Sequence, residues 1–236
     1  MRTTTLKPAT PQRGSVLEAV GFDLDGTLLV AGRSREALLH DACERVGAPR
    51  LPRAAYLRVH RDQQDVADRE AVFAALLAAE GVDDVAPGAL ATAYDTVVAE
   101  ATGPLPGAAA LVERLRERYR VGLLTDGPVE TQRRKLHRNG WASLFDAVVV
   151  TGSLPAPKPD ERAFETLCET LDVPPERTAY VGDAPEADVA GAAAAGLRPV
   201  QVLYEGGPDP HPAAAATVER ASLPAALPAV LDGLGG

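Results

Sequence analysis

The sequence predicts an α/β fold, in which a doubly wound parallel sheet carries a small inserted helical domain. Two observations predict this fold. Short apolar runs alternate with amphipathic stretches at helical spacing through most of the 236 residues, the pattern of a parallel sheet with helices on both faces. In addition, roughly 100 residues separate the first apolar run from the second, far more than a simple crossover needs.

Five short apolar runs are the expected strands of the sheet. They are Leu17–Asp23, Val121–Thr125, Ala147–Thr151, Ala179–Val181 and Pro199–Leu203. Amphipathic stretches from Leu111 to Tyr119 and from Phe164 to Leu171 lie between them and are expected to be helices that pack on the sheet. A Gly- and Pro-rich loop follows at Glu205–Ala216, and we expect the segment after it to lie along the edge of the core.

Residues 32–102 are predicted to form the inserted helical domain, and residues 1–31 and 103–236 the α/β core. Two apolar helical faces support the insertion; they comprise Leu38, Leu39, Ala42, Cys43 and Val46, and Val72, Phe73, Leu76 and Leu77. Residues 1–14 are rich in Thr and Pro and lack an apolar segment, so we expect a flexible tail rather than a secretory signal.

Composition argues against several classes of function. A net charge of -9 and an aromatic content of 4% disfavour a nucleic-acid polymer as partner. No apolar run approaches the length of a membrane span, so no membrane partner is expected. Cys43 and Cys168 lack metal-type spacing, and we expect reduced core thiols in a cytoplasmic protein.

Polar residues follow the expected strands at the point where each strand ends. They are Asp23 and Asp25 after the first, Thr125, Asp126 and Gly127 at the second, Lys158 beyond the third, and Asp183 and Asp188 after the fourth. Because the carboxyl ends of parallel strands share one edge, where ligands bind, we expect these side chains in one crevice. Carboxylates without nearby histidine or cysteine suit Mg²⁺, and a lysine with a hydroxyl suits a transferring phosphoryl group.

Each feature also has an ordinary structural explanation. Asp183 with Glu186 fits a helix capping box, Thr125 to Gly127 fits a plain turn, and a loop lysine such as Lys158 is by default exposed. Asp23 and Asp25 are harder to explain, because a strand buried on both faces rarely ends in two carboxylates. The set as a whole therefore favours an active site.

Lysine is rare in this chain. Lys7, Lys135 and Lys158 are the only lysines among 24 basic residues, and the others are arginine. A lysine kept in such a chain suggests a need for its compact charge. We expect this need at Lys158, whereas Lys135 is expected to be an exposed helix residue with no role in the site.

Four motifs resemble those of the haloacid dehalogenase (HAD) superfamily. They are Asp23-x-Asp25-Gly-Thr-Leu, Thr125-x-Gly, Lys158-Pro-Asp and Gly-Asp183-x4-Asp188, which occur in the family's order. Between them, the segment from Gln132 to Leu136 is similar to its capped (C1-type) phosphatase branch. The resemblance implies a Rossmann-like core with a helical cap over residues 32–102, and a Mg²⁺-dependent phosphoric monoester hydrolase.

The resemblance also implies a role for each motif residue. Asp23 is the nucleophile that forms an aspartyl-phosphate, and Asp25 is the acid and base. Thr125 and Lys158 hold the phosphoryl oxygens, and Asp126 and Gly127 are further residues that bind the substrate phosphate.

The same resemblance implies the residues around Mg²⁺. The implied ligands are Asp23, Asp183 and the backbone carbonyl of Asp25. Asp188 is expected to contact these ligands without binding the ion itself. The chain departs from the family pattern at Asp126, where Asn is more frequent, and at Ala184, where a small polar residue is more frequent.

Other functions stay open at this point. A 2-haloacid dehalogenase of the same fold has no use for the acid Asp25, and a phosphosugar mutase differs only in its product. A receiver-like signalling module also places Asp, Thr and Lys at strand ends, but without a helical insertion. The expected partner is a small phosphorylated metabolite, such as a sugar phosphate, phosphoglycolate or a nucleotide, and the expected state is a monomer or homodimer.

Overall fold

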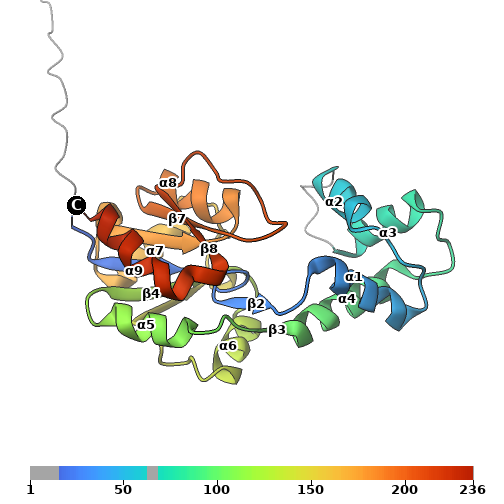
Figure 1. Ribbon diagram of the computed structural model, residues 1–236, viewed down its shortest axis with the longest axis horizontal. Helices are drawn as coiled ribbons and strands as arrows, with labels where there is room; N and C mark the ends of the chain where they lie inside the picture. The colour runs from blue at the N-terminus through green and yellow to red at the C-terminus, as the bar shows by residue number, and fades with distance from the viewer. Residues whose placement is uncertain (1–15, 63–68, 236) are drawn as a thin grey trace, which may run out of the picture. The chain divides into compact units, whose positions relative to one another are not determined.

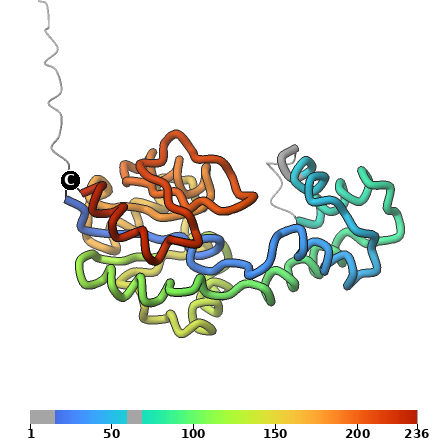
Figure 2. The backbone as a smooth tube through the Cα atoms, in the orientation of Figure 1, coloured from blue at the N-terminus to red at the C-terminus, as the bar shows by residue number. Residues whose placement is uncertain are grey.

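The computed structural model of the protein describes residues 16–62 and 69–235, so the expected flexible tail at residues 1–14 lies outside the described residues. The chain divides into two compact units. Among the described residues, one unit holds 16–28 and 104–235, and the other holds 29–62 and 69–103. Both borders differ slightly from residues 32–102, because strands β2 (Leu29–Ala31) and β3 (Thr102–Pro104) pair with each other in a separate two-stranded sheet. The blue and green segments that carry these strands run side by side in the backbone tube of Figure 2.

The core unit contains a six-stranded sheet in the order β5-β4-β1-β6-β7-β8, with every neighbouring pair parallel. Strands β4, β7 and β8 of this sheet are labelled in Figure 1. The strands are β1 (Ala19–Phe22), β4 (Arg120–Thr125), β5 (Ala147–Val150), β6 (Thr178–Gly182), β7 (Arg198–Leu203) and β8 (Ala216–Glu219). The predicted parallel α/β sheet is therefore confirmed. The edge strand β8 was not predicted as a strand, because it is short and only Val218 within it is buried.

Helices cover the sheet of the core unit. They are α5 (Ala108–Arg116), α6 (Val129–Arg138), α7 (Glu161–Leu171), α8 (Gly191–Ala194) and α9 (Leu223–Leu234), with short helical turns at Thr151–Ser153, Pro175–Arg177, Pro185–Ala190 and Arg220–Ser222. The buried side chains Phe164 and Leu167 of α7 pack against Leu124 and Tyr180 of the sheet. A Cβ atom at Gly21 of β1 would lie 2.6 Å from Leu167, so glycine there lets α7 approach the sheet closely.

The helical unit contains α1 (Arg35–Val46), α2 (Arg53–Asp62), α3 (Arg69–Ala79) and α4 (Pro87–Ala101). Helix α1 begins where the Ser34 side chain accepts a hydrogen bond from the Ala37 amide, and it ends at Gly47 in the left-handed conformation. The rings of Tyr56, Phe73 and Tyr94 lie 5.6–5.9 Å apart in the centre of this unit. Its buried apolar residues give the unit a hydrophobic core of its own.

Strand order in the core unit fixes the position of the site. β1 lies between β4 and β6, and Phe22, its last residue, is paired with both Leu123 and Val181. The chain runs from β1 to β4 on one side and later to β6 on the other, so β1 is the point at which the strand order switches. No helix among the described residues has the length and apolar character needed to cross a membrane.

Candidate active site

The nucleophile candidate Asp23 is the first residue beyond β1. Its backbone amide donates to the Val181 carbonyl at 2.9 Å, so the pairing with β6 extends to this residue. This hydrogen bond fixes the position of Asp23 along β6. Thr125 closes β4 on one side, and Asp183 follows β6 on the other. Three neighbouring strands thus place these three residues at the same edge.

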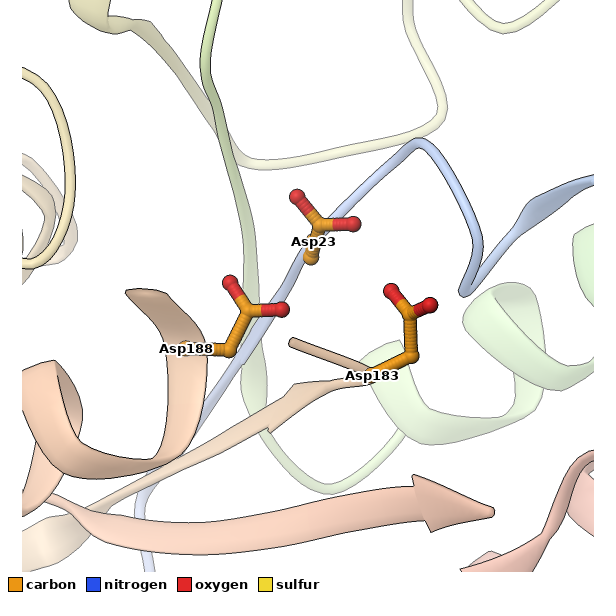
Figure 3. Close-up of side chains that lie close together, drawn as sticks. All are labelled: Asp23, Asp183 and Asp188. Carbon is orange, nitrogen blue, oxygen red and sulfur yellow. The ribbon is translucent and has the colours of Figure 1, made fainter. Parts of the chain in front are cut away.

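Three carboxylates gather at this edge: Asp23, Asp183 and Asp188 offer oxygens that all lie within 4.8 Å of one another (Figure 3). Burial raises the pKa of Asp23 well above its ordinary value, with Asp188 and Asp183 adding to the effect and Lys158 opposing it. Burial, helped by the charge of Asp188, raises the pKa of Asp183 from 3.8 to about 6. Three carboxylates against one lysine leave an excess of negative charge, and hard oxygen ligands of this kind fit Mg²⁺.

Lys158 is buried among these groups, with only 2% of its side chain exposed. Its Nζ donates to Asp23 Oδ1 at 2.7 Å, Asp188 Oδ1 at 2.6 Å and the Tyr180 hydroxyl at 3.1 Å. Burial lowers the pKa of Lys158, but the surrounding Asp23, Tyr180 and Asp188 outweigh burial and hold the pKa well above its ordinary value. Lys158 is therefore a buried cation that contacts the nucleophile candidate, as its predicted role requires.

Asp188 lies in the helical turn at Pro185–Ala190, and hydrogen bonds within the protein occupy both of its oxygens. Oδ1 accepts from Lys158, and Oδ2 accepts from the Ala184 amide at 2.9 Å. This arrangement suits a residue that orients others rather than one that donates its own oxygens to an ion. At Gly26, with φ of +103°, a Cβ atom would lie 2.4 Å from the Asp183 carboxylate, so glycine there keeps the space beside Asp183 open.

Thr125 contacts a residue that was not predicted to belong to the site. Gln132, on α6, is 2% exposed, and its Nε2 lies 2.7 Å from Thr125 Oγ1, 2.7 Å from the Asp126 carbonyl and 2.8 Å from Asp25 Oδ2. Its Oε1 finds no hydrogen-bond partner among the described residues. One amide thus joins the predicted phosphate-binding hydroxyl to the predicted acid and base.

Asp25 points toward α6 rather than toward the carboxylate cluster. Its Oδ2 accepts hydrogen bonds from Gln132 and from Lys135 Nζ, the latter at 2.5 Å. The expectation that Lys135 is an exposed helix residue with no role in the site is therefore wrong. Lys135 was misjudged because its neighbours Arg133, Arg134 and Arg138 are exposed, whereas its own side chain is only 33% exposed and reaches back over the helix to Asp25.

The Asp126 carboxylate turns away from the site and holds the loop that carries Lys158. Its Oδ1 accepts from the Thr151 hydroxyl at 2.8 Å and from the Lys158 amide at 3.1 Å. Any contact of residue 126 with a phosphoryl group is thereby left to its backbone amide. Gly127 follows with φ of +120°, a conformation that favours glycine and turns the chain into α6.

Comparison with known proteins agrees with this geometry. Residues 17–196 match the family model of the haloacid dehalogenase-like hydrolases. A phosphoglycolate phosphatase from Cereibacter sphaeroides is 33% identical over 77% of this chain and 83% of its own length. The pyrimidine 5'-nucleotidase YjjG from Escherichia coli is 34% identical, but its match spans only 48% of this chain and 51% of that protein.

Solved structures show the same fold at lower sequence identity. A putative β-phosphoglucomutase from Thermotoga maritima has a TM-score of 0.71 at 23% identity, covering 91% of this chain and all of its own. The putative HAD-hydrolase YfnB from Bacillus subtilis has a TM-score of 0.71 at 22% identity, covering 92% of this chain and all of its own. The resemblance read from the four motifs is confirmed, and the chain belongs to the haloacid dehalogenase-like hydrolases.

Proposed function

We propose that this enzyme is a Mg²⁺-dependent phosphatase that hydrolyses a small phosphate monoester through a phosphorylated Asp23. One observation carries the proposal: the Asp23 carboxylate is buried, a lysine holds one of its oxygens, and the acid candidate Asp25 follows two residues later. A buried carboxylate with one oxygen held by a cation and the other unengaged is suited to nucleophilic attack on phosphorus. The named phosphatases among the relatives support the same reaction class.

The residues divide the reaction between them. Asp23 attacks phosphorus with the oxygen that Lys158 does not contact, while Lys158 and the Thr125 hydroxyl stabilise the phosphoryl oxygens. Asp25 protonates the departing ester oxygen and then takes a proton from the water that attacks the phosphorus of phospho-Asp23. The carboxylate of Asp23 is thereby restored and inorganic phosphate leaves.

Asp23 and Asp183 would hold the ion, with the Asp25 backbone carbonyl as a third ligand and Asp188 behind them. The excess negative charge and the all-oxygen set of donors fit a magnesium ion better than zinc. When bound, the ion would supply positive charge against the phosphoryl oxygens and the Asp23 carboxylate.

The substrate we propose is a small phosphorylated metabolite, such as a sugar phosphate, phosphoglycolate or a nucleotide. The names of three relatives support this substrate class: a phosphoglycolate phosphatase, a pyrimidine 5'-nucleotidase and an N-acylneuraminate-9-phosphatase. Because the three named substrates differ, they do not select one compound within the class. We assign substrate selection to the helical unit at Leu29–Gly103, because it has a core of its own and is inserted directly after the nucleophile loop.

Two assays on a panel of phosphate esters test the proposed function. EDTA is expected to abolish phosphate release, and Mg²⁺ but not Ca²⁺ is expected to restore it, because Mg²⁺ demands the tighter ligand geometry. Acetyl phosphate is expected to label Asp25→Asn but not Asp23→Asn, which mass spectrometry of the intact protein would reveal. Full turnover in EDTA, or a labelled Asp23→Asn variant, would refute the proposal.

Product analysis separates the phosphatase from its nearest alternative. A mutase of the same fold would return the phosphoryl group to a sugar, so a sugar bisphosphate would yield an isomerised monophosphate in place of inorganic phosphate. The proposed acid role of Asp25, whose carboxylate accepts from two donors on α6, argues against a dehalogenase, because a departing halide needs no proton.

A further inference from the structure

Helix α6 presents two donors to the side chain of Asp25. Gln132 and Lys135 are three residues apart, so their side chains emerge on the same side of the helix, one turn from each other. Gln132 Nε2 and Lys135 Nζ both reach the same carboxylate oxygen, Oδ2, at 2.8 Å and 2.5 Å. Among the side chains described at residues 16–59 and 69–235, none makes a hydrogen bond or ion pair with the other oxygen, Oδ1.

This asymmetry leaves one oxygen of Asp25 available to a substrate. Both neighbours of Oδ2 are donors, and their two hydrogen bonds hold this oxygen against α6. Oδ1 is therefore the oxygen that can meet a substrate and exchange a proton with it. The pair with Lys135 is partly exposed to water and adds little stability, so its effect is mainly one of orientation.

Gln132 extends the same control to Thr125. Its Nε2 carries two hydrogens and lies among three oxygens, whereas a rotated amide would place Oε1 against the Asp25 carboxylate and the Asp126 carbonyl, where no hydrogen is available. This nitrogen can donate to Thr125 Oγ1 but cannot accept from it, so the hydrogen of the Thr125 hydroxyl is left to donate elsewhere. The hydroxyl can then donate to a phosphoryl oxygen.

We propose that Gln132 and Lys135 are positioning residues for the acid–base step, holding Asp25 with Oδ1 toward the leaving group. This inference rests on the proposed function. When Asp23 bonds to phosphorus, the ester P–O bond breaks, its electron pair stays on the ester oxygen, and that oxygen takes the proton from Oδ1. In hydrolysis, Oδ1 takes a proton from the attacking water, and the P–O bond to Asp23 breaks to restore the carboxylate.

Leaving groups of different basicity test the inference. An alkyl phosphate that the wild type hydrolyses requires protonation of its leaving oxygen, whereas dinitrophenyl phosphate does not. Lys135→Met is expected to lower kcat/KM for the alkyl ester about 10- to 100-fold, a fraction of the roughly 10²–10⁴-fold that general acid catalysis contributes, and for the dinitrophenyl ester less than about threefold. Gln132→Leu is expected to lower both, because it also releases Thr125, but the alkyl ester more.

Three further measurements complete the design. The neighbouring exposed Arg134→Met has the same charge change and should leave both rates unchanged. In an Asp25→Asn background, Lys135→Met should have no further effect on the alkyl ester, because residues that act as one unit are not additive. Equal losses on both esters, or a full additional loss in the Asp25→Asn background, would overturn the inference. A wild type that hydrolyses neither ester would instead refute the proposed function.

Discussion

Asp23 and Asp25 are separated by a single residue, yet the lysines that pair with them lie in very different environments. In the pair of Lys158 with Asp23, the side chains are 2% and 8% exposed, and Lys158 also contacts Asp188 and Tyr180. In the pair of Lys135 with Asp25, the side chains are 33% and 42% exposed. We call these the buried pair and the rim pair.

The difference shows that the same two residue types serve different purposes in one site. Burying a carboxylate without a nearby cation lowers the free energy of unfolding. The charge of Lys158 is therefore needed to compensate the buried carboxylates of Asp23 and Asp188. The rim pair is solvated and contributes little to stability. In the proposal above, its lysine fixes the direction of a side chain that exchanges protons with substrate and water. On that proposal, water access separates a charge-compensating lysine from an orienting one.

The largest expected effect on stability is the loss of the buried lysine, compared with loss of the rim lysine. Lys158→Met is expected to lower the free energy of unfolding in EDTA by about 3–5 kcal/mol, because it leaves buried carboxylates uncompensated. Lys135→Met is the matched control and is expected to cost less than about 1 kcal/mol. Urea unfolding at neutral pH measures both values.

The pH dependence of the Lys158→Met penalty sharpens this comparison. Protonation can relieve the uncompensated carboxylates, so the penalty is expected to shrink as pH falls and to grow as pH rises. Similar losses for the two lysine variants, or a penalty for Lys158→Met that is independent of pH, would show that burial does not distinguish the two pairs.

The buried side of the site was predictable from the sequence, because strand ends determine it. Asp23, Thr125 and Asp183 terminate or follow apolar runs, and parallel strands bring such ends together whatever the details of packing. Lys158 was predictable as a member of the site from its motif, although its burial was not. Its side chain is enclosed only because Tyr180 and Asp188, from distant segments, close around it.

The rim side was not predictable, because it depends on the rotation of one helix. Residues 133 to 138 of α6 are mostly charged, and only the packing of Leu136 decides that Gln132 and Lys135 face the site while Arg134 faces solvent. The direction of the Asp126 side chain likewise depends on the hydroxyl of Thr151, which lies in a turn 25 residues away. The short edge strand β8 escaped prediction because it contains a single buried residue.

Replacement of Asp183 is expected to change stability by an intermediate amount, and to raise it where the loss of Lys158 lowers it. Its pKa rises from 3.8 to about 6 in the folded protein, so between these pH values the folded state binds more protons than the unfolded state. Stability is therefore lost as pH rises through this window, and above it the cost is at most about 3 kcal/mol. Asp183→Asn in EDTA is expected to be more stable than wild type at pH 7 and to vary less with pH between about 4 and 6.

Addition of Mg²⁺ is expected to reverse this order. Wild type gains stability by binding the ion, about 2.7 kcal/mol at a hundred times Kd, whereas Asp183→Asn gains little because it lacks a ligand. Thermal melts with and without the ion measure both arms, and Asp209→Asn at an exposed loop position serves as the control. An Asp183→Asn variant that is less stable than wild type in EDTA would mean that this carboxylate is not strained by burial.

The smallest expected effect tests whether Lys158 needs every one of its partners. The Tyr180 hydroxyl is buried, donates to the Leu124 carbonyl at 2.9 Å and accepts from Lys158. Tyr180→Phe keeps the ring, which packs edge-on against Phe164, and removes only these two hydrogen bonds. Lys158 still contacts Asp23 and Asp188, so its charge remains compensated. We expect a loss of about 1–2 kcal/mol in the free energy of unfolding.

The corresponding change in activity should be modest, because the two carboxylates alone can orient Lys158. We expect kcat to fall less than about tenfold, which corresponds to less than about 1.4 kcal/mol in the barrier. Tyr119→Phe is a matched control in the same unit, since the Tyr119 hydroxyl makes no hydrogen bond to the side chains described at residues 16–59 and 69–235 or to the described backbone. A loss for Tyr180→Phe as large as that for Lys158→Met would mean that the hydroxyl, rather than the carboxylates, holds the lysine in place. Equal stability of Tyr180→Phe and wild type would mean that Lys158 and the Leu124 carbonyl satisfy each other without it.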